Sequence, residues 1–196
     1  MSKGRITRPR IRIGATILAI VGLLLFVTFI PTNTAGAQTS QFTAGDATVK
    51  TNSGMLKQIT VAPSGDVEYY GFEQEPDNVT VQVEAKPAGA SNWEQVHSAE
   101  LISDGSGLGL EGNISYDVST INLLAETSMK KQDFRPTDGA TSETDVQVRV
   151  TVTFAGAGSN GDDVETTSQD TFTVIVENIA AGGNIGGNAN TNAKGN

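Results

Sequence analysis

Most residues in this sequence that could do chemistry are carboxylates. Asp162, Asp163 and Glu165 lie close together near the C-terminal end, and Asp170 follows them. Hard oxygen ligands at such short spacing can hold Ca²⁺ in a loop of an extracellular protein. The D-x-[DN]-x-[DN]-G spacing of a calcium loop is absent. We therefore expect solvated loop charges, and keep Asp162, Asp163 and Glu165 as the calcium candidates.

A second motif has the spacing of a dinucleotide-binding loop. Gly107–Gly112 reads GLGLEG and matches G-x-G-x-x-G, which must follow a strand and open a helix whose N–H groups face the pyrophosphate. Here Asn113–Val118 follows with the pattern of a strand, and Glu111 would oppose the phosphates. The motif therefore predicts a flexible turn starting near Asp104-Gly105, and no cofactor is expected.

Nucleophilic and acid–base catalysis have little to build on. The single histidine, His97, has no G-x-S-x-G nucleophile motif to serve, so we expect a partly exposed strand histidine. Glu73 and Glu75 lie beside Pro76 in a turn-like stretch, and nothing marks them as an acid/base pair. The absence of cysteine excludes disulfides, thiol catalysis and Cys zinc sites. We predict no catalytic residue and no enzyme.

Two N-x-[ST] sequons are present, Asn78-Val79-Thr80 and Asn113-Ile114-Ser115. They matter only in an exported domain, where Asn78 and Asn113 become the glycosylation candidates. In DVEYYGF, strand alternation places Tyr69 and Tyr70 on opposite faces. We expect one buried ring and one at the sheet rim, where an exposed tyrosine beside acidic residues could serve as a contact site.

The elements that must position these residues follow a strongly asymmetric start. Residues 1–12 are basic, and residues 13–30 form an almost wholly apolar run of about 27 Å as a helix, close to a bilayer core. Pro31 then ends the helix, and Ala35-Gly36-Ala37 has the A-x-A spacing of a signal-peptidase site. The run is therefore either a retained transmembrane helix or a signal sequence cut after Ala37. Both outcomes place the remainder outside the membrane.

That remainder is acidic. All 22 carboxylates and only 8 of the 13 basic residues follow Ala37, and 8 − 22 gives a net charge of −14. Such a surface repels nucleic acid and suits solubility or high salt. We expect membrane attachment through the N-terminal helix if it is uncleaved, and a protein or surface-layer partner.

The exported part reads as β. Period-two alternation is clearest in 144–154, 171–177 and 78–85, and the first two are expected to pair as a hairpin with a long loop over 156–168. Further strands are expected at 56–61, 67–72, 93–102 and 114–118, and a short helix at 121–129. Trp93 shares the parity of Ala99 and Leu101, which predicts the central core aromatic.

About seven short strands predict a mainly β fold, an antiparallel sandwich of Ig-like or FnIII-like type over residues 55–179. Residues 31–54 read as a linker or stalk, and the Gly/Asn-rich residues 180–196 as a disordered tail.

This layout resembles exported immunoglobulin-like or fibronectin-III-like surface proteins of halophilic archaea, a resemblance that implies a location and fold more than an activity. The apolar run also resembles an archaellin amino-terminal helix, with Ile13-Gly14 leading it and Asn33–Gly36 following it.

The sequence therefore predicts a non-enzymatic extracytoplasmic surface protein with a structural, adhesive or assembly role. It would be single-pass at the cell membrane with the C-terminal domain outside, or secreted if cleaved. The alternatives are a pilin-like or archaellin-like filament subunit, and an exported carboxylate-dependent hydrolase or carbohydrate-binding module.

Overall fold

The computed structural model describes residues 35–51, 55–178, 187–191 and 194–195, within a compact unit that spans Asn33–Asn196. The predicted segments 1–12 and 13–30 lie outside the described residues. The strands are β1 Gly36–Thr39, β2 Phe42–Thr43, β3 Ala47–Thr51, β4 Leu56–Val61, β5 Ser64–Tyr70, β6 Val79–Pro87, β7 Glu94–Ile102, β8 Gly112–Asp117, β9 Ile121–Asn122, β10 Thr141–Phe154, β11 Val164–Asn178, β12 Gly187–Thr191 and β13 Lys194–Gly195. Short helical turns occur at α1 Leu123–Glu126, η1 Lys131–Phe134 and η2 Ser159–Gly161.

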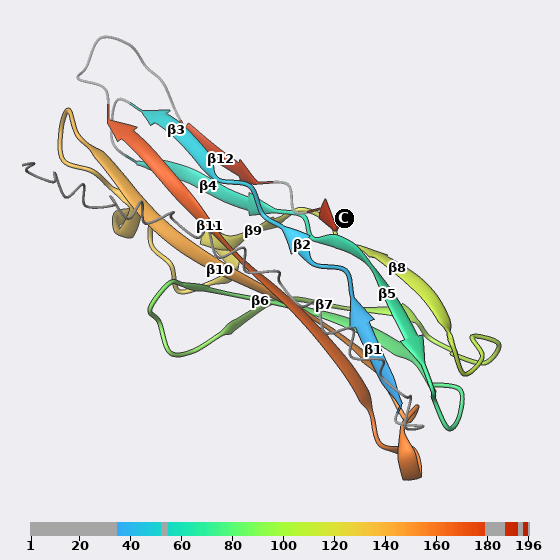
Figure 1. Ribbon diagram of the computed structural model, residues 1–196. Helices are drawn as coiled ribbons and strands as arrows, with labels where there is room; N and C mark the ends of the chain where they lie inside the picture. Colours follow the sequence, from blue (N-terminus) through green and yellow to red (C-terminus); the bar gives the residue numbers. More distant parts are fainter. Residues whose placement is uncertain (1–34, 52–54, 179–186, 192–193, 196) are drawn as a thin grey trace, which may run out of the picture. The chain divides into compact units, whose positions relative to one another are not determined.

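The larger layer is a five-stranded sheet in the order β3-β11-β10-β6-β7 (Figure 1). Its centre is the β10–β11 hairpin, in which Thr141 pairs with Glu177 and Phe154 with Val164. Valine alternates with polar residues along β10, so every second side chain from Val146 to Phe154 is buried. The predicted hairpin is confirmed, but β11 begins at Val164, so its loop is shorter than expected.

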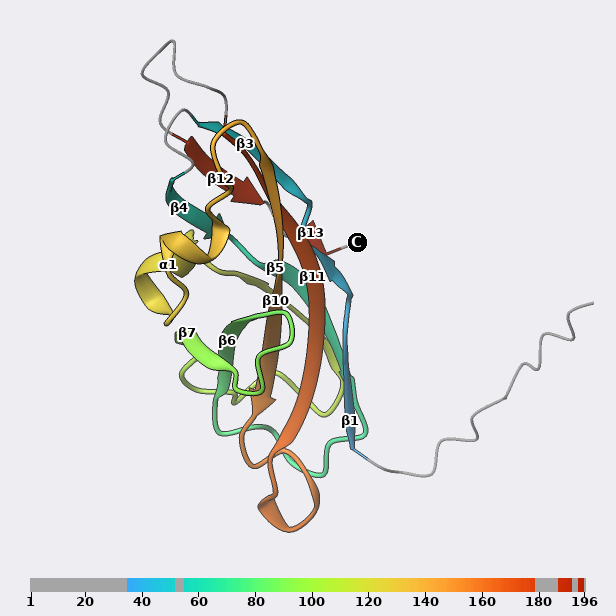
Figure 2. The same cartoon turned by 90° about the vertical axis from the view of Figure 1, so that its left-hand side faces the viewer.

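The second layer consists of two three-stranded sheets, β12-β4-β9 and β1-β5-β8 (Figures 1 and 2). They follow one another because β4 leads directly into β5 through Ala62-Pro63. The Val118 N–H donates a hydrogen bond to the Pro63 carbonyl, which joins the segment after β8 to the connection between β4 and β5. The protein is therefore mainly β, with sheets packed as a sandwich-like or half-barrel fold.

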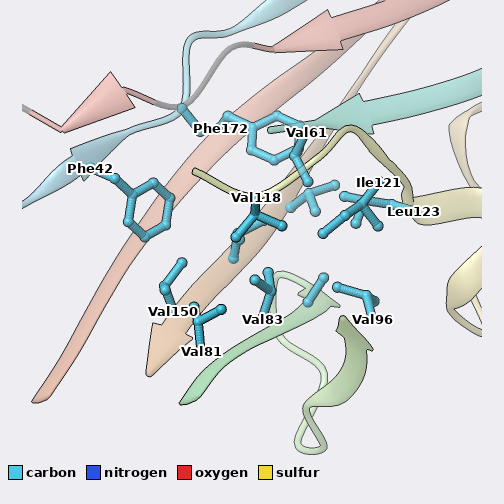
Figure 3. Packing of buried hydrophobic residues seen from close by; sticks show 14 of the residues in the cluster. Phe42, Val61, Val81, Val83, Val96, Val118, Ile121, Leu123, Val150 and Phe172 are labelled. Atoms are coloured by element: carbon cyan, nitrogen blue, oxygen red, sulfur yellow. The ribbon is translucent and has the colours of Figure 1, made fainter. Parts of the chain in front are cut away.

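The hydrophobic core lies between these layers (Figure 3). Val81, Val83 and Val150 come from the five-stranded sheet, and Val61 and Ile121 come from the opposing layer. All five side chains are buried. Burial of such a side chain is worth about 1.5–3 kcal/mol, so with no cysteine in the chain this core is the main source of stability.

The expectation of a linker over 31–54 is wrong where the structure describes it. Residues of that stretch form β1, β2 and β3, which pair with β5, β13 and β11. Phe42 is completely buried in the core. The Thr/Gly/Ala-rich composition concealed these strands because each is short and has few apolar residues.

The expectation of a disordered tail over 180–196 is also corrected for residues 187–191 and 194–195, the part of it that the structure describes. Gly187–Thr191 forms β12, which pairs with β4 in parallel, and β13 pairs with β2. The β3–β11 pair is parallel as well, so the sheets are not purely antiparallel. Backbone hydrogen bonds to an existing strand require no apolar side chains, which is why composition gave no signal.

The expected helix at 121–129 shrinks to one turn. Ile121 and Asn122 form β9, and α1 covers only Leu123–Glu126, with Leu123 buried beneath it. The position before the helix is Asn122, and its side chain makes no capping bond. Over the described ranges, no helix has the length and apolar character needed to cross a membrane.

Candidate functional site

The glycine-rich loop between β7 and β8 holds a carboxylate from its own chain. The Gly107 and Gly109 N–H groups donate to the two oxygens of Glu75, at 3.0 and 3.3 Å. Both glycines have positive φ, and their N–H groups point toward the same carboxylate. The predicted turn is confirmed, and the amides that would face a pyrophosphate in a dinucleotide site face Glu75 instead.

The loop is fixed to its neighbours at each end. A Cβ on Gly105 would lie 2.0 Å from the Pro76 carbonyl oxygen, so this approach requires glycine. Hydrogen bonds from the Ser106 N–H, which has the larger effect, and from the Ser106 hydroxyl lower the pKa of the Asp104 carboxyl group. The Leu108 carbonyl accepts a 2.7 Å bond from the Tyr69 hydroxyl. The loop is therefore held in place by its close approach to Pro76 and by the hydrogen bond from Tyr69, a residue of the aromatic core.

Glu73 and Glu75 bind different loops. The Ser159 hydroxyl donates to Glu73 at 2.7 Å, whereas Glu75 accepts from the glycine loop. Glu73 lines a hollow of about 540 Å³ together with Glu111 and the exposed Leu110.

The acidic residues in and near the β10–β11 turn accept hydrogen bonds from different partners. Asp163 accepts the Gly156 N–H at 2.9 Å, and Glu165 accepts the Thr153 hydroxyl at 3.3 Å. Asp170 lies farther along β11 and accepts the Ala44 N–H at 2.7 Å, while the Asp162 carbonyl accepts from Gly158. Across the residues that the structure describes, no three His, Cys, Asp or Glu side chains are grouped to hold a metal ion.

Tyr69 and Tyr70 lie on opposite faces of β5, as predicted. Tyr69 is 2% exposed and packs against Phe72 and Phe154, with ring centroids 5.0 and 5.2 Å away. Tyr70 is 41% exposed and lines a hollow with Glu68, Glu111 and Asn113. The exposed tyrosine therefore does lie beside acidic residues.

His97 is half-buried on β7 and pairs with Val83 on the neighbouring strand β6, so it is a strand histidine as expected.

The two sequons differ in accessibility. Asn113 is exposed on β8, the outer strand of its sheet, whereas Asn78 is half-buried and its carbonyl accepts the Ala155 N–H.

Trp93 was expected in the core, and this expectation is wrong. The indole is only partly buried and lies near two cations of the five-stranded sheet, with Lys86 Nζ 4.7 Å and Arg149 Cζ 4.4 Å from the ring centroid. The pairing of β6 with β7 skips one residue between His97 and Gln95, a β-bulge that reverses the alternation. Trp93 therefore does not share the inward face of Ala99.

Arg149 is in turn fixed by Glu84. Its Nε and Nη2 both lie on Glu84 Oε2, at 2.8 and 2.6 Å. The alternation of residues 144–154 places Arg149 on the face opposite to the buried valines. Its contacts follow only from the strand register, which pairs Arg149 with Glu84. Lys86 lies next to Trp93 in the same cluster. The sequence interpretation missed this polar cluster, which consists of Glu84, Lys86, Trp93 and Arg149.

Comparison of the chain with protein-family models found no match, and comparison with curated proteins found none either. The function must therefore be argued from the residues of this chain.

Proposed function

We propose that this protein is a non-enzymatic extracytoplasmic surface protein, with an acidic β domain used in structure, adhesion or assembly. The observation that carries the proposal is the place where the domain begins. The apolar run ends at Ile30, and β1 starts at Gly36 and is already paired with β5. A membrane segment at 13–30 would hold the folded domain directly at the outer surface, because the few intervening residues span about 20 Å at most.

The same strand favours retention of the N-terminal segment. Ala37 pairs with Tyr69 in the middle of β1, and Gly36 pairs with Tyr70. A cut after Ala37 would leave only Gln38 and Thr39 of the strand and would remove the residue over which the Tyr70 ring packs. An uncleaved anchor keeps β1 whole.

The finer assignment to an Ig-like or FnIII-like sandwich, and the origin in a halophilic archaeon, are parts of the same proposal. The seven strands expected from sequence all pair in the two layers, and the charge of −14 after Ala37 suits high salt. Nucleic acid is not proposed as a partner, since this charge repels it.

Membrane fractionation with protease treatment of intact source cells tests the location. We expect the protein in the membrane fraction, with its β domain reached by external protease. Protein that stays in the cytosolic fraction and is protected in intact cells would overturn the proposal.

A filament subunit is the second proposal, because the apolar run 13–30 resembles an archaellin amino-terminal helix and the first strand of the β domain begins soon after it, at Gly36. It predicts polymers of the full chain, visible by electron microscopy of cell-surface preparations. A uniformly monomeric protein extracted from the membrane would contradict this alternative and leave the first intact.

A further inference from the structure

The outward face of the five-stranded sheet carries an ordered array of hydroxyl and amide groups. We call its central part the outer polar face and define it by twelve residues that alternate with the buried ones; the outward carboxylates Glu143, Asp145 and Glu177 lie beyond it, toward one end of β10 and β11. They are Thr80, Gln82, Glu84 and Lys86 on β6, Gln147, Arg149, Thr151 and Thr153 on β10, and Glu165, Thr167, Gln169 and Thr171 on β11. The register aligns them in four rows across the sheet, such as Gln82–Thr151–Thr167.

Much of the hydrogen-bonding capacity of this face is unused by the protein. In the described part of the chain, the side-chain amides of Gln82, Gln147 and Gln169 make no hydrogen bond with another residue. Thr151 and Thr167 share a single bond of 3.1 Å between their hydroxyls. A hydroxyl both donates and accepts, and an amide offers two donors and an acceptor. The face therefore presents hydrogen-bond donors and hydrogen-bond acceptors together, at positions that the strand register fixes.

The face is also hollowed at its centre. A depression of about 330 Å³ is bounded by Gln82, the Glu84–Arg149 ion pair, Glu165 and three threonines. The three threonines are Thr151, Thr153 and Thr167. The ion pair fixes the guanidinium, so Arg149 is a pre-oriented donor in the wall of the depression.

An aromatic ring lies beside this depression. Trp93 precedes β7, and its indole lies within 4.7 Å of Lys86 Nζ on β6 and within 4.4 Å of Arg149 Cζ on β10. Because β6 separates β7 from β10, the indole extends over the outer face of β6. The ring therefore adds a partly exposed apolar surface next to Arg149, a residue that also lines the depression.

The charge of this face differs from that of the rest of the domain. Its two carboxylates, Glu84 and Glu165, are balanced by Lys86 and Arg149, so its net charge is 2 − 2 = 0. The other residues after Ala37 carry 20 carboxylates and 6 cations, a net charge of −14. A polyanion would be repelled by the domain as a whole, and a polycation would gain most from contacts elsewhere.

We propose that the outer polar face binds a neutral oligosaccharide or polysaccharide chain. Sugar hydroxyls can exchange hydrogen bonds with the free amides and threonine hydroxyls, and an apolar face of a sugar ring can pack on the indole of Trp93. A protein partner would need a cluster of large apolar anchors, whereas the twelve residues of the outer polar face include no large apolar side chain and only the indole of Trp93 lies next to their ion pair. This inference names the chemistry of the adhesive role proposed above and rests on that role.

The test uses the full chain in a detergent without a sugar headgroup. Native gels containing a soluble β-glucan, a mannan or a galactan report binding as retarded migration. Trp93 is the only tryptophan in the chain, so its fluorescence reports contact at this face alone. We expect retardation and a change in emission with at least one polysaccharide, both insensitive to salt.

Substitutions locate the site. Trp93→Ala should weaken binding by about tenfold, which corresponds to about 1.4 kcal/mol, and Thr167→Ala should weaken it measurably. Thr48→Ala removes the same hydroxyl from an exposed position on β3, at the far edge of the same sheet, and should leave binding unchanged.

The proposal is overturned if none of these polysaccharides retards the protein or alters its emission, or if binding survives Trp93→Ala unchanged. It is also overturned if only a sulfated polysaccharide or a protein binds. None of these outcomes depends on where the protein resides, so the membrane location can stand or fall separately.

Discussion

Gly112→Ala tests the packing of the β1-β5-β8 sheet. All three tyrosines of the chain lie there, and each covers a glycine on the neighbouring strand: Tyr69 covers Gly112, Tyr70 covers Gly36, and Tyr116 covers Gly65. Such an aromatic ring over a cross-strand glycine compensates for the missing side chain. At Gly112 the added Cβ would lie 2.6 Å from Tyr69 Oη and 2.9 Å from its Cζ.

The cost follows from how firmly Tyr69 is held. Its ring packs against Phe72 and Phe154, and its hydroxyl donates to Leu108, so it cannot turn away without losing these contacts. Forcing a methyl group into packed surroundings costs about 1–3 kcal/mol, and losing the hydrogen bond costs about 1 kcal/mol. Gly112 has no left-handed backbone, so alanine adds no φ strain to this sum. We expect a loss of about 2–4 kcal/mol, or about 4–16 °C in Tm.

Thermal unfolding of the full chain in detergent, followed by circular dichroism, measures this loss. Gly36→Ala is the matched control, because the atoms nearest to its added Cβ belong to the side chain of Tyr70, at 3.0 Å, and that side chain is 41% exposed and can move. Adding Tyr69→Phe to Gly112→Ala should recover part of the lost stability by removing Oη. If Gly112→Ala unfolds at the wild-type temperature, or both glycine variants lose equally, the packing argument is wrong.

Three further predictions follow from burial and exposure. Burial raises the pKa of Tyr69 and of Tyr116 above the unfolded value of 10.0, so the contribution of these two rings to stability should be complete below about pH 10 and should be lost as pH rises further. Absorbance at 295 nm and circular dichroism should therefore change together in alkali, and ionisation of these rings in a fully folded protein would contradict this. If the source cell glycosylates its surface proteins, peptide mass mapping should find the glycan on exposed Asn113 in preference to half-buried Asn78, and the reverse order would be a failure. Phe172→Ala should cost about 3–5 kcal/mol in urea unfolding, since Phe172 is fully buried in the core, and a loss below 1 kcal/mol would refute its placement.

The sequence predicted best where side-chain alternation was strong. The valines of β10 and β6 placed both strands and their buried faces correctly, and Tyr69 and Tyr70 were assigned to opposite faces. These predictions hold because a period of two and a single buried face leave little freedom of register.

Prediction failed where backbone pairing or register decided the outcome. A bulge in β7 moved Trp93 out of the core, and local alternation contains no sign of such an inserted residue. Strands β1 to β3 and β12 lie in low-hydrophobicity segments and form by pairing with distant strands. The neighbours of Arg149 depend on how β6 aligns with β10, so the cluster with Glu84 and Trp93 required the structure.

The central claim is that an uncleaved N-terminal segment holds the acidic β domain on the outside of the membrane. Intact mass spectrometry of the protein extracted from isolated membranes tests it most directly. We predict a polypeptide that retains residues 13–37, with any added mass accounted for by modification. A membrane-free protein whose first residue is Gln38 would contradict the account, because β1 would then have lost Gly36 and Ala37.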